Sequence, residues 1–80
     1  MFRRHLANFA HSRSIRLERA AAGLRGDAKA IMLDRSLHWH YRCLYLSGLM
    51  DWPTYSSNAY LLRRMIRHRR RVGSKQPFPL

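Results

Sequence analysis

The chain has one cysteine, Cys43, among its 80 residues, so no internal disulfide can hold it together. It has no CxxC pair and no His/Cys quartet of the kind that binds a structural zinc ion. A chain this short buries only about 60 to 65% of the surface of its unfolded state. Its net charge of +12 also opposes compaction by self-repulsion. We therefore expect the chain to complete its core against a partner and not to exist as an independent monomer.

Acidic residues are scarce. The chain has four Asp and Glu residues and 16 Lys and Arg residues, of which 14 are arginine. No acidic residue follows Asp51, so residues 52–80, with six arginines and one lysine, carry a charge of +7. Such a balance indicates a polyanionic partner, namely nucleic acid, an anionic membrane or an acidic protein. The hydrophobic fraction of 46% is too high for a disordered basic tail. The sequence therefore predicts an ordered basic protein, or one that its partner orders.

Long apolar runs and catalytic constellations are also lacking. No run approaches the roughly 20 residues of a membrane span. Cys43 has histidine neighbours, but neither Asp34 nor Asp51 is placed to orient a base, and no glycine-rich phosphate loop occurs. On a helix His38 and His40 point about 200° apart, and His40 with Cys43 supplies only two metal ligands. We expect no enzyme, no metal and no cofactor.

The N-terminal segment, residues 1–26, has six arginines and one acidic residue, with serine, alanine and spaced apolar residues. Three apolar residues share one helical face: Phe2, Leu6 and Phe9. This composition is typical of a mitochondrial targeting segment, and the alternative is a basic helix or arm of the mature protein. We predict helix over residues 2–10 and 14–22, a break at Gly23 and Gly26, and localisation in the mitochondrial matrix or on the matrix side of the inner membrane.

The central segment predicts a helix over residues 27–49, with Asp27 as its N-cap after Gly26. One apolar stripe follows helical spacing: Ala30, Leu33, Leu37, Tyr41, Leu44 and Gly48. Met32, Trp39 and Leu46 lie off this stripe. Because the helix is apolar on more than one side, we expect it to be buried among partners.

The segment after residue 50 predicts a turn and a second main helix. Pro53 disfavours helical geometry at Trp52, so residues 51–54 are expected to form the turn, and Ser56 or Ser57 to cap a helix over residues 57–72. Gly73 supplies a stop, and prolines keep residues 74–80 extended. The expected fold is all-α: an antiparallel hairpin of two main helices in 27–73, a basic helical arm in 1–26 and an extended tail in 74–80.

Arginines form the candidate contacts to RNA or to another acidic partner, because one-signed charge is unfavourable without a counter-charge. These residues are Arg3, Arg4, Arg13, Arg16, Arg19, Arg42, Arg63, Arg64, Arg67, Arg69, Arg70 and Arg71. Apolar stripe residues are the candidates for packing against protein: Leu37, Tyr41, Leu44, Leu61, Leu62, Met65 and Ile66. Interleaved aromatic residues are common at RNA surfaces and at protein interfaces alike. A helix lying on an anionic membrane ranks third, because the stripe after Tyr60 is narrow and has no Trp or Phe anchor.

One stretch goes beyond composition. The segment "HYRCLYLSGLMDWPTYSSNAYLLRRMIRHRRR", residues 40–71, resembles the first two helices of the mitochondrial LYR-motif family. Tyr41 and Arg42 match the Tyr-Arg of the motif, with His40 in place of its leucine. Five residues match the second helix if about one residue is inserted: Tyr60, Arg63, Arg64, Ile66 and Arg67. The resemblance implies a small helical mitochondrial adaptor that binds acyl carrier protein through Arg42, Arg63, Arg64 and Arg67.

These observations favour a structural subunit of a large mitochondrial assembly. The leading hypothesis is a mitochondrial ribosomal protein whose arginine clusters contact rRNA and whose apolar stripes contact neighbouring ribosomal proteins. The alternative is an LYR-like accessory subunit of a respiratory-chain complex, which binds acyl carrier protein and other subunits of that complex. The two hypotheses differ in whether the arginines face RNA or protein.

Overall fold

The computed structural model describes residues 2–72, with side chains from Arg3 onward. These residues form three helices, α1 (Phe2–Ala21), α2 (Gly26–Leu46) and α3 (Trp52–Val72), and no strand is present among them. The prediction of an all-α chain is therefore confirmed. The predicted stop at Gly73 and the predicted extended tail over residues 74–80 lie outside the described residues.

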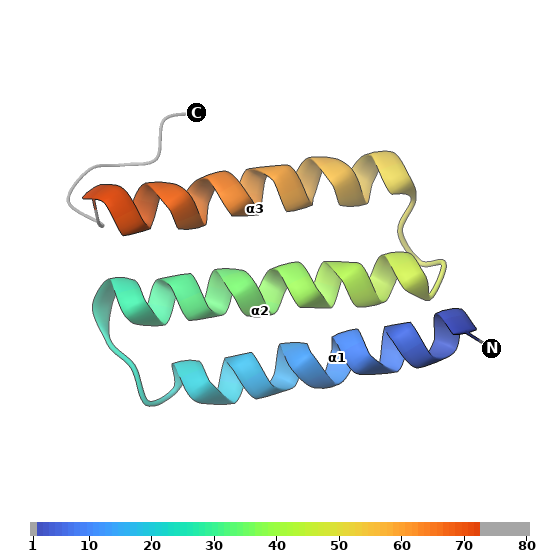
Figure 1. Ribbon diagram of the computed structural model, residues 1–80, viewed down its shortest axis with the longest axis horizontal. Coiled ribbons are helices and arrows are strands. Elements are labelled where there is room, and N and C mark those ends of the chain that lie inside the picture. Colours follow the sequence, from blue (N-terminus) through green and yellow to red (C-terminus); the bar gives the residue numbers. More distant parts are fainter. Residues whose placement is uncertain (1, 73–80) are drawn as a thin grey trace.

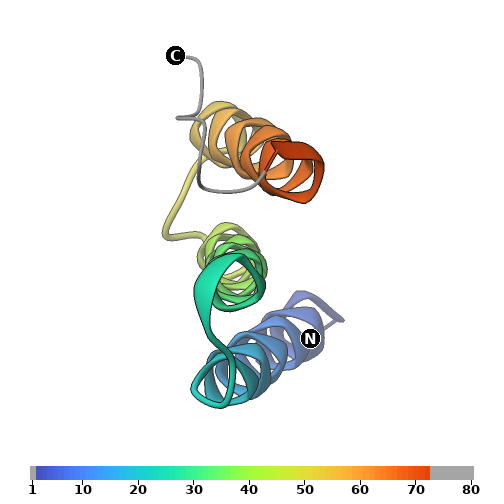
Figure 2. The ribbon, with the colours of Figure 1, turned by 90° about the vertical axis from the view of Figure 1, so that its left-hand side faces the viewer.

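The three helices lie side by side in a single layer, with α2 in the middle (Figures 1 and 2). The chain reverses direction at each loop, and α1 and α3 make contacts with α2 but not with each other. The overall extents are 44 × 29 × 14 Å, and the shortest is little more than the diameter of one helix with its side chains, about 10 to 12 Å. No large side chain in the described region is fully buried, because neither broad face of the layer is covered.

Helix α1 packs on α2 through small residues that recur every three or four positions. The buried residues of this seam are Ala7, Ala10, Ser14, Leu17 and Ala21. Small side chains let the two backbones approach closely, and a spacing of three and four keeps one face of α1 against its neighbour. The Ser36 hydroxyl on α2 donates a hydrogen bond of 2.8 Å to the Ser14 carbonyl, and both serines are buried. The seam therefore makes α1 part of the layer.

The predicted interruption of α1 between residues 10 and 14 is wrong, because the helix is continuous from Phe2 to Ala21. Residues 11–13 contain neither glycine nor proline, and the seam passes across them without a change of register. The predicted apolar face does not carry the packing either, since Phe9 is 58% exposed and Leu6 is 39% exposed.

Helix α2 begins and ends earlier than predicted. Arg25, not Asp27, occupies the N-cap position and makes no side-chain capping bond, while Asp27 lies in the first turn, where its carboxylate suits the helix dipole. At the other end the Gly48 amide donates to the Tyr45 carbonyl at 3.1 Å and the Leu49 amide to the Leu44 carbonyl at 2.9 Å. Gly48 has a φ of +81°, so it is the left-handed stop of a Schellman motif and not a stripe residue.

Helix α3 begins five residues before the predicted start, because Asp51 caps it. The Asp51 carboxylate accepts a 2.8 Å hydrogen bond from the Thr54 amide, and its carbonyl accepts a 3.0 Å bond from the Tyr55 amide. Pro53 lies in the first turn, where its missing N–H would have no partner within the helix in any case. The predicted turn over residues 51–54 and the predicted caps Ser56 and Ser57 are therefore wrong.

Helix α3 contacts α2 through Tyr55, Ala59 and Leu62, which are 7%, 3% and 5% exposed. Their spacing of four and three residues places them on one face. Further along the same face the Arg69 Nε donates to the Asp34 Oδ2 at 3.0 Å. The α2–α3 contact thus runs along α3 from its first turn nearly to its last.

Candidate functional site

Five exposed arginines of α3 lie on one side of the helix. They are Arg63, Arg64, Arg67, Arg70 and Arg71. At 3.6 residues per turn their directions fall within an arc of about 120°, and we call this set the arginine strip. Helix α3 contains no acidic residue. Tyr60 lies within the same arc and is 59% exposed, with the Arg64 guanidinium 5.7 Å from its ring centroid.

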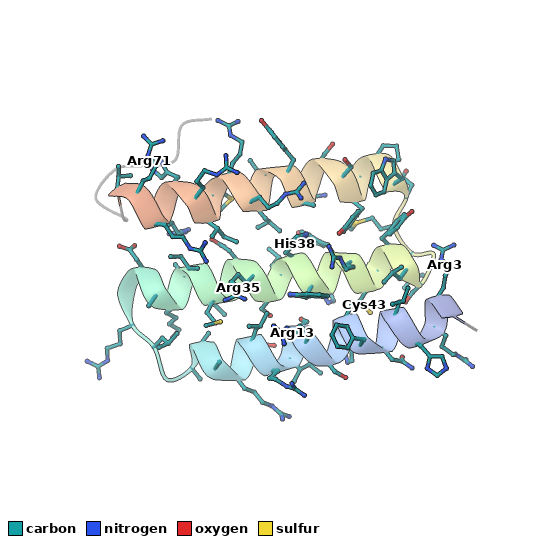
Figure 3. All side chains as sticks on the ribbon, in the orientation of Figure 1. Arg3, Arg13, Arg35, His38, Cys43 and Arg71 are labelled. Atoms are coloured by element: carbon teal, nitrogen blue, oxygen red, sulfur yellow. The ribbon has the colours of Figure 1, made fainter. Side chains whose placement is uncertain are left out.

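Arg69 does not belong to this strip. Its direction is about 160° from the middle of the strip, and its side chain is 29% exposed against 14% for Asp34. The ion pair between them joins α3 to α2. Figure 3 shows Arg71, in contrast, on the side of α3 that points away from α2.

Two predicted contact residues, Arg42 and Arg13, are directed to aromatic rings between the helices. The Arg42 Nε donates a 3.1 Å hydrogen bond to the Tyr55 hydroxyl, and its guanidinium carbon lies 4.7 Å from the Trp39 ring centroid. The Arg13 guanidinium lies 5.9 Å from the same centroid. Both arginines are half-buried, and both guanidinium groups lie within cation–π distance of Trp39.

The other predicted contact residues of α1 are exposed. Arg3 donates a 3.2 Å hydrogen bond to the Tyr45 carbonyl, a favourable place for a cation because it is the C-terminal end of α2. Its guanidinium also lies 5.7 Å from the Tyr45 ring. Arg4, Arg16 and Arg19 are exposed on α1. These four arginines are on α1 and therefore form a set separate from the arginine strip of α3.

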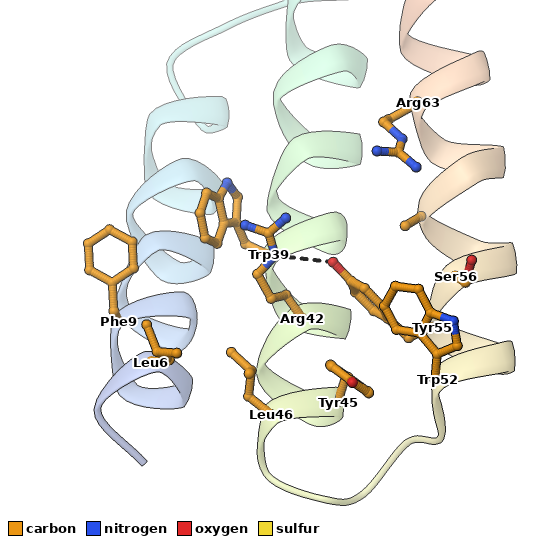
Figure 4. Close-up of a pocket in the computed structure, with 11 residues that line it drawn as sticks. Leu6, Phe9, Trp39, Arg42, Tyr45, Leu46, Trp52, Tyr55, Ser56 and Arg63 are labelled. Carbon is orange, nitrogen blue, oxygen red and sulfur yellow. Dashed lines mark hydrogen bonds between the residues drawn. The ribbon is translucent and has the colours of Figure 1, made fainter. Parts of the chain in front are cut away.

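A groove opens on one face of the layer, across the middle helix (Figure 4). It encloses about 490 Å³, and we call it the aromatic groove. Side chains from all three helices line it: Leu6 and Phe9 from α1; Trp39, Arg42, Tyr45 and Leu46 from α2; Trp52, Tyr55, Ser56, Ala59 and Arg63 from α3. It lies between α1 and α3, which are too far apart to contact each other.

The aromatic rings of the groove are packed mainly against one another. Tyr45 and Tyr55 stack with centroids 5.0 Å apart and planes inclined by 15°. Trp52 lies 5.6 Å from Tyr45 and 5.8 Å from Tyr55. Phe9 meets Trp39 edge-on at 5.8 Å. These contacts join all three helices at one end of the layer, although Trp52 and Phe9 stay 59% and 58% exposed.

His38 lies beside this groove, between α2 and α3. Its ring stacks on Tyr55 at 6.3 Å. Burial, followed by the positive charges of Arg42 and Arg63, lowers the pKa of His38 from its ordinary value of 6.5. Its Nε2 atom is buried and has no hydrogen-bond partner among the described residues. Burial and the two nearby positive charges therefore favour the neutral form of the His38 imidazole.

The predicted protein-packing residues are divided between helix contacts and open surface. Leu62 is buried, and four others are half-buried: Tyr41, Leu44, Met65 and Ile66. Leu37 and Leu61 are 38% and 40% exposed. The stripe positions Leu33, Leu37 and Leu44 point within about 40° of one another, on the side of α2 opposite the groove. On this second face of the layer Leu33 and Leu37 are exposed, and Leu44 is half-buried.

The groove was not predicted from the sequence, although part of its signal is present there. Trp39, Arg42 and Leu46 have the spacing of three and four residues that places them on one face of α2. Periodicity alone placed Trp39 and Leu46 off the main apolar stripe and did not group them. The predicted turn over residues 51–54 separates Trp52 from the following helix, so the sequence does not group Tyr45, Trp52 and Tyr55 with them.

Within residues 2–72 the helices offer neither a membrane span nor a metal site. None of the three helices is long and apolar enough to cross a membrane. No three His, Cys, Asp or Glu side chains in this part of the chain are grouped so that they could hold a metal ion. Cys43 is half-buried and free.

Comparison of the chain with protein-family models, with curated proteins and with solved structures gives no match in any of the three. The resemblance to the LYR-motif family therefore stays a prediction, and the arginine strip and the aromatic groove are the features of the molecule that indicate a function.

Proposed function

We propose that the chain is a structural subunit of a large mitochondrial ribonucleoprotein assembly, most consistent with a mitochondrial ribosomal protein. In this proposal the arginine strip neutralises rRNA phosphates, and the open apolar surfaces of the layer dock on neighbouring proteins. The single observation that carries the proposal is the strip. Its five exposed arginines point within an arc of about 120° around α3, and this helix has no acidic residue.

Electrostatics within α3 favours a polyanion over plain solvent. Arg63 and Arg67, and Arg67 and Arg71, are four residues apart, and like charges at this spacing destabilise a helix by about 0.2 to 0.5 kcal/mol per pair. A row of phosphates on the strip reverses the sign of these interactions. From Arg63 to Arg71 the strip extends about 12 Å along the helix, long enough to contact several phosphates of a structured nucleic acid.

The type of side chain supports RNA as the polyanion. The strip is built of arginine and not lysine, and a planar guanidinium forms paired hydrogen bonds with phosphate and stacks on bases. The exposed Tyr60 ring adds an aromatic surface within the strip. RNA recognition commonly combines phosphate contacts with stacking on aromatic rings.

The finer arrangement belongs to the same proposal. Residues 27–73 act as an antiparallel hairpin that presents the strip, and the targeting-like residues 1–26 stay on the mature protein because α1 supplies the seam against α2. The composition of this N-terminal segment supports a location in the matrix or on the matrix side of the inner membrane.

Charge reversal on the strip tests the proposal. The double variant Arg67→Glu/Arg71→Glu should bind a structured RNA at least about tenfold more weakly than wild type in fluorescence anisotropy, because it replaces two phosphate contacts with repulsion. The control Arg25→Glu/Lys29→Glu changes the net charge equally at two other exposed positions and should lose much less. Equal losses in the two variants would mean that the strip is not the RNA-binding surface.

An LYR-like accessory subunit of a respiratory-chain complex is the second candidate. The observation that favours it is that Arg63, Arg64 and Arg67, three of the four arginines implied by the resemblance, are exposed together. The fourth, Arg42, is engaged with Trp39 and Tyr55. Under this alternative, purified acyl carrier protein is captured by wild type and lost on Arg63→Glu/Arg64→Glu. Co-sedimentation with inner-membrane complexes instead of ribosomal particles would also favour it.

A further inference from the structure

The aromatic groove has the shape of a binding site for one more helix. Helices α1 and α3 both flank α2 without contacting each other, so the face of α2 between them is uncovered. Packed helices lie about 8 to 10 Å apart, and a helix resting on α2 would therefore contact α1 and α3 as well. The layer is only 14 Å thick at its narrowest extent, which leaves this face without any other cover from the described chain.

The groove carries the kind of side chains that anchor protein interfaces. Phe9 on α1 and Trp52 on α3 are 58% and 59% exposed, and they stand on opposite sides of it (Figure 4). Trp39 lies on α2 between them. The residues that contribute most to binding in measured interfaces are enriched in tryptophan, tyrosine and arginine, and an uncovered patch of this kind marks a contact surface.

The positive charge of the groove indicates the charge expected of its partner. Arg42 and Arg63 line the groove, and none of the residues that line it is acidic. The lowered pKa of His38, to which both arginines contribute after burial, reflects the positive field on this side. A partner that carries carboxylates beside its apolar stripe would compensate this field, whereas a basic partner would be repelled.

Two other occupants fit the groove less well. RNA bases would need free ring faces, but Tyr45 and Tyr55 are stacked on each other and Phe9 is engaged with Trp39. Phosphates would also have to approach an apolar wall that includes Leu6 and Leu46. A second copy of this chain would bring another charge of +12 to the interface, with no acidic residue in its own groove.

We propose that the aromatic groove binds an amphipathic helix of a partner protein, with the apolar side of that helix on Phe9, Trp39 and Trp52 and its flanking acidic residues toward Arg42 and Arg63. This inference rests on the protein-contacting half of the proposed function. The groove shares Arg63 with the strip, whereas Arg67 and Arg71 do not line it.

The two tryptophans of the chain both line the groove, so their emission reports its occupancy directly. The probe is a synthetic peptide of about 18 residues, or five helical turns, with a Leu/Phe stripe flanked by glutamates. Added to the full chain, it should produce a saturable blue shift of tryptophan emission. A peptide with the same stripe and lysine in place of glutamate should produce little shift.

Matched variants locate the binding. Phe9→Glu should weaken binding of the acidic peptide about tenfold, since burial of a phenylalanine is lost, whereas Leu37→Glu, at a 38% exposed position on the other face, should not. Arg63→Glu should weaken binding about fivefold through loss of the favourable charge, and Arg71→Glu, with the same charge change, should leave it within about twofold. Far-UV circular dichroism checks that each variant keeps its helix content.

Several results would overturn the inference. They are no shift with the acidic peptide, an equal shift with the basic peptide, or equal losses in Phe9→Glu and Leu37→Glu. Displacement of the peptide by structured RNA would assign the groove to RNA, and a dimer whose emission is already shifted without peptide would assign it to a second copy. The variant Arg67→Glu/Arg71→Glu distinguishes the two proposals. If the strip proposal fails, this variant keeps RNA binding; if the groove proposal fails, the peptide does not bind even to wild type.

Discussion

Arginine side chains in this chain have three different surroundings. Arg69 is paired with Asp34, while Arg3, Arg13 and Arg42 lie against aromatic rings. The strip arginines are exposed on α3, and one of them, Arg64, also lies near the Tyr60 ring. The planar guanidinium suits all three, because it forms directed ion pairs, stacks on rings and binds phosphate. The sequence predicts twelve arginines as equivalent partner contacts, because composition cannot distinguish an arginine that faces a ring from one that faces solvent.

His38 gives a residue-level prediction about pH. Its folded-state pKa is lowered from 6.5, so the unfolded chain takes up this proton first. Its contribution to stability is therefore complete above about pH 6.5 and is lost as the pH falls through the folded-state pKa. Thermal melts followed by circular dichroism between about pH 7 and pH 5 should show the melting temperature fall with pH, and less steeply in His38→Gln. A His11→Gln variant is the control, and an undiminished fall in His38→Gln would contradict this role.

At the scale of the element, the presence of the helices was predictable, whereas their ends and the continuity of α1 across residues 11–13 were not. Periodicity and composition predicted helix in all three segments, and each helix is present. The ends depended on single residues whose signals had competing interpretations. Gly48 fitted a helical stripe but is a Schellman stop, and Pro53 suggested a break but lies in a first turn opened by Asp51. A short capping residue before an early proline is the signal that distinguishes the two cases.

The Asp51 cap can be tested with two substitutions. The Thr54 side chain and amide lower the pKa of the Asp51 carboxyl, so this carboxylate keeps its charge and its capping role at neutral pH. Asp51→Ala should reduce helix content and lower the melting temperature by a few degrees, because the first turn of α3 loses an acceptor. Asp51→Asn keeps an acceptor and should stay close to wild type. A melting temperature unchanged in Asp51→Ala would show that the cap is dispensable.

The seam between α1 and α2 can be tested by overpacking. Ala10 is 0% exposed, so Ala10→Leu should destabilise the layer by about 1 to 3 kcal/mol. Ala20→Leu adds the same side chain at an exposed position of the same helix and should change stability by less than about 0.5 kcal/mol. Denaturant titration followed by circular dichroism compares the two. Equal stabilities would mean that α1 does not pack on α2 as described.

At the scale of the whole molecule, the order of the helices and the groove could not be predicted. Which helix lies in the middle depends on how the small seam of α1 and the Tyr55, Ala59 and Leu62 face of α3 both meet α2. The groove then arises from residues far apart in sequence, such as Phe9 and Trp52, whose proximity no local period indicates. The small-residue repeat of α1 is visible in the sequence. The face with Phe9 was predicted to pack instead, because its side chains are larger.

The flat layer also gives a physical reason for expecting a partner. Apolar side chains are exposed on both faces, with Phe9 and Trp52 in the groove and Leu33 and Leu37 on the opposite face. A single layer of helices cannot bury two faces, since stable domains bury each apolar face against another layer. Docking between neighbours in a large assembly would cover both faces.

The salt dependence of RNA binding by the full chain tests the central claim most directly. If the five strip arginines contact phosphates, log K should fall with log salt concentration with a slope of about −4 between about 50 and 200 mM. In Arg67→Glu/Arg71→Glu the slope should become shallower by about 2, one for each lost contact. A wild-type slope near zero, or the same slope in both proteins, would contradict the account.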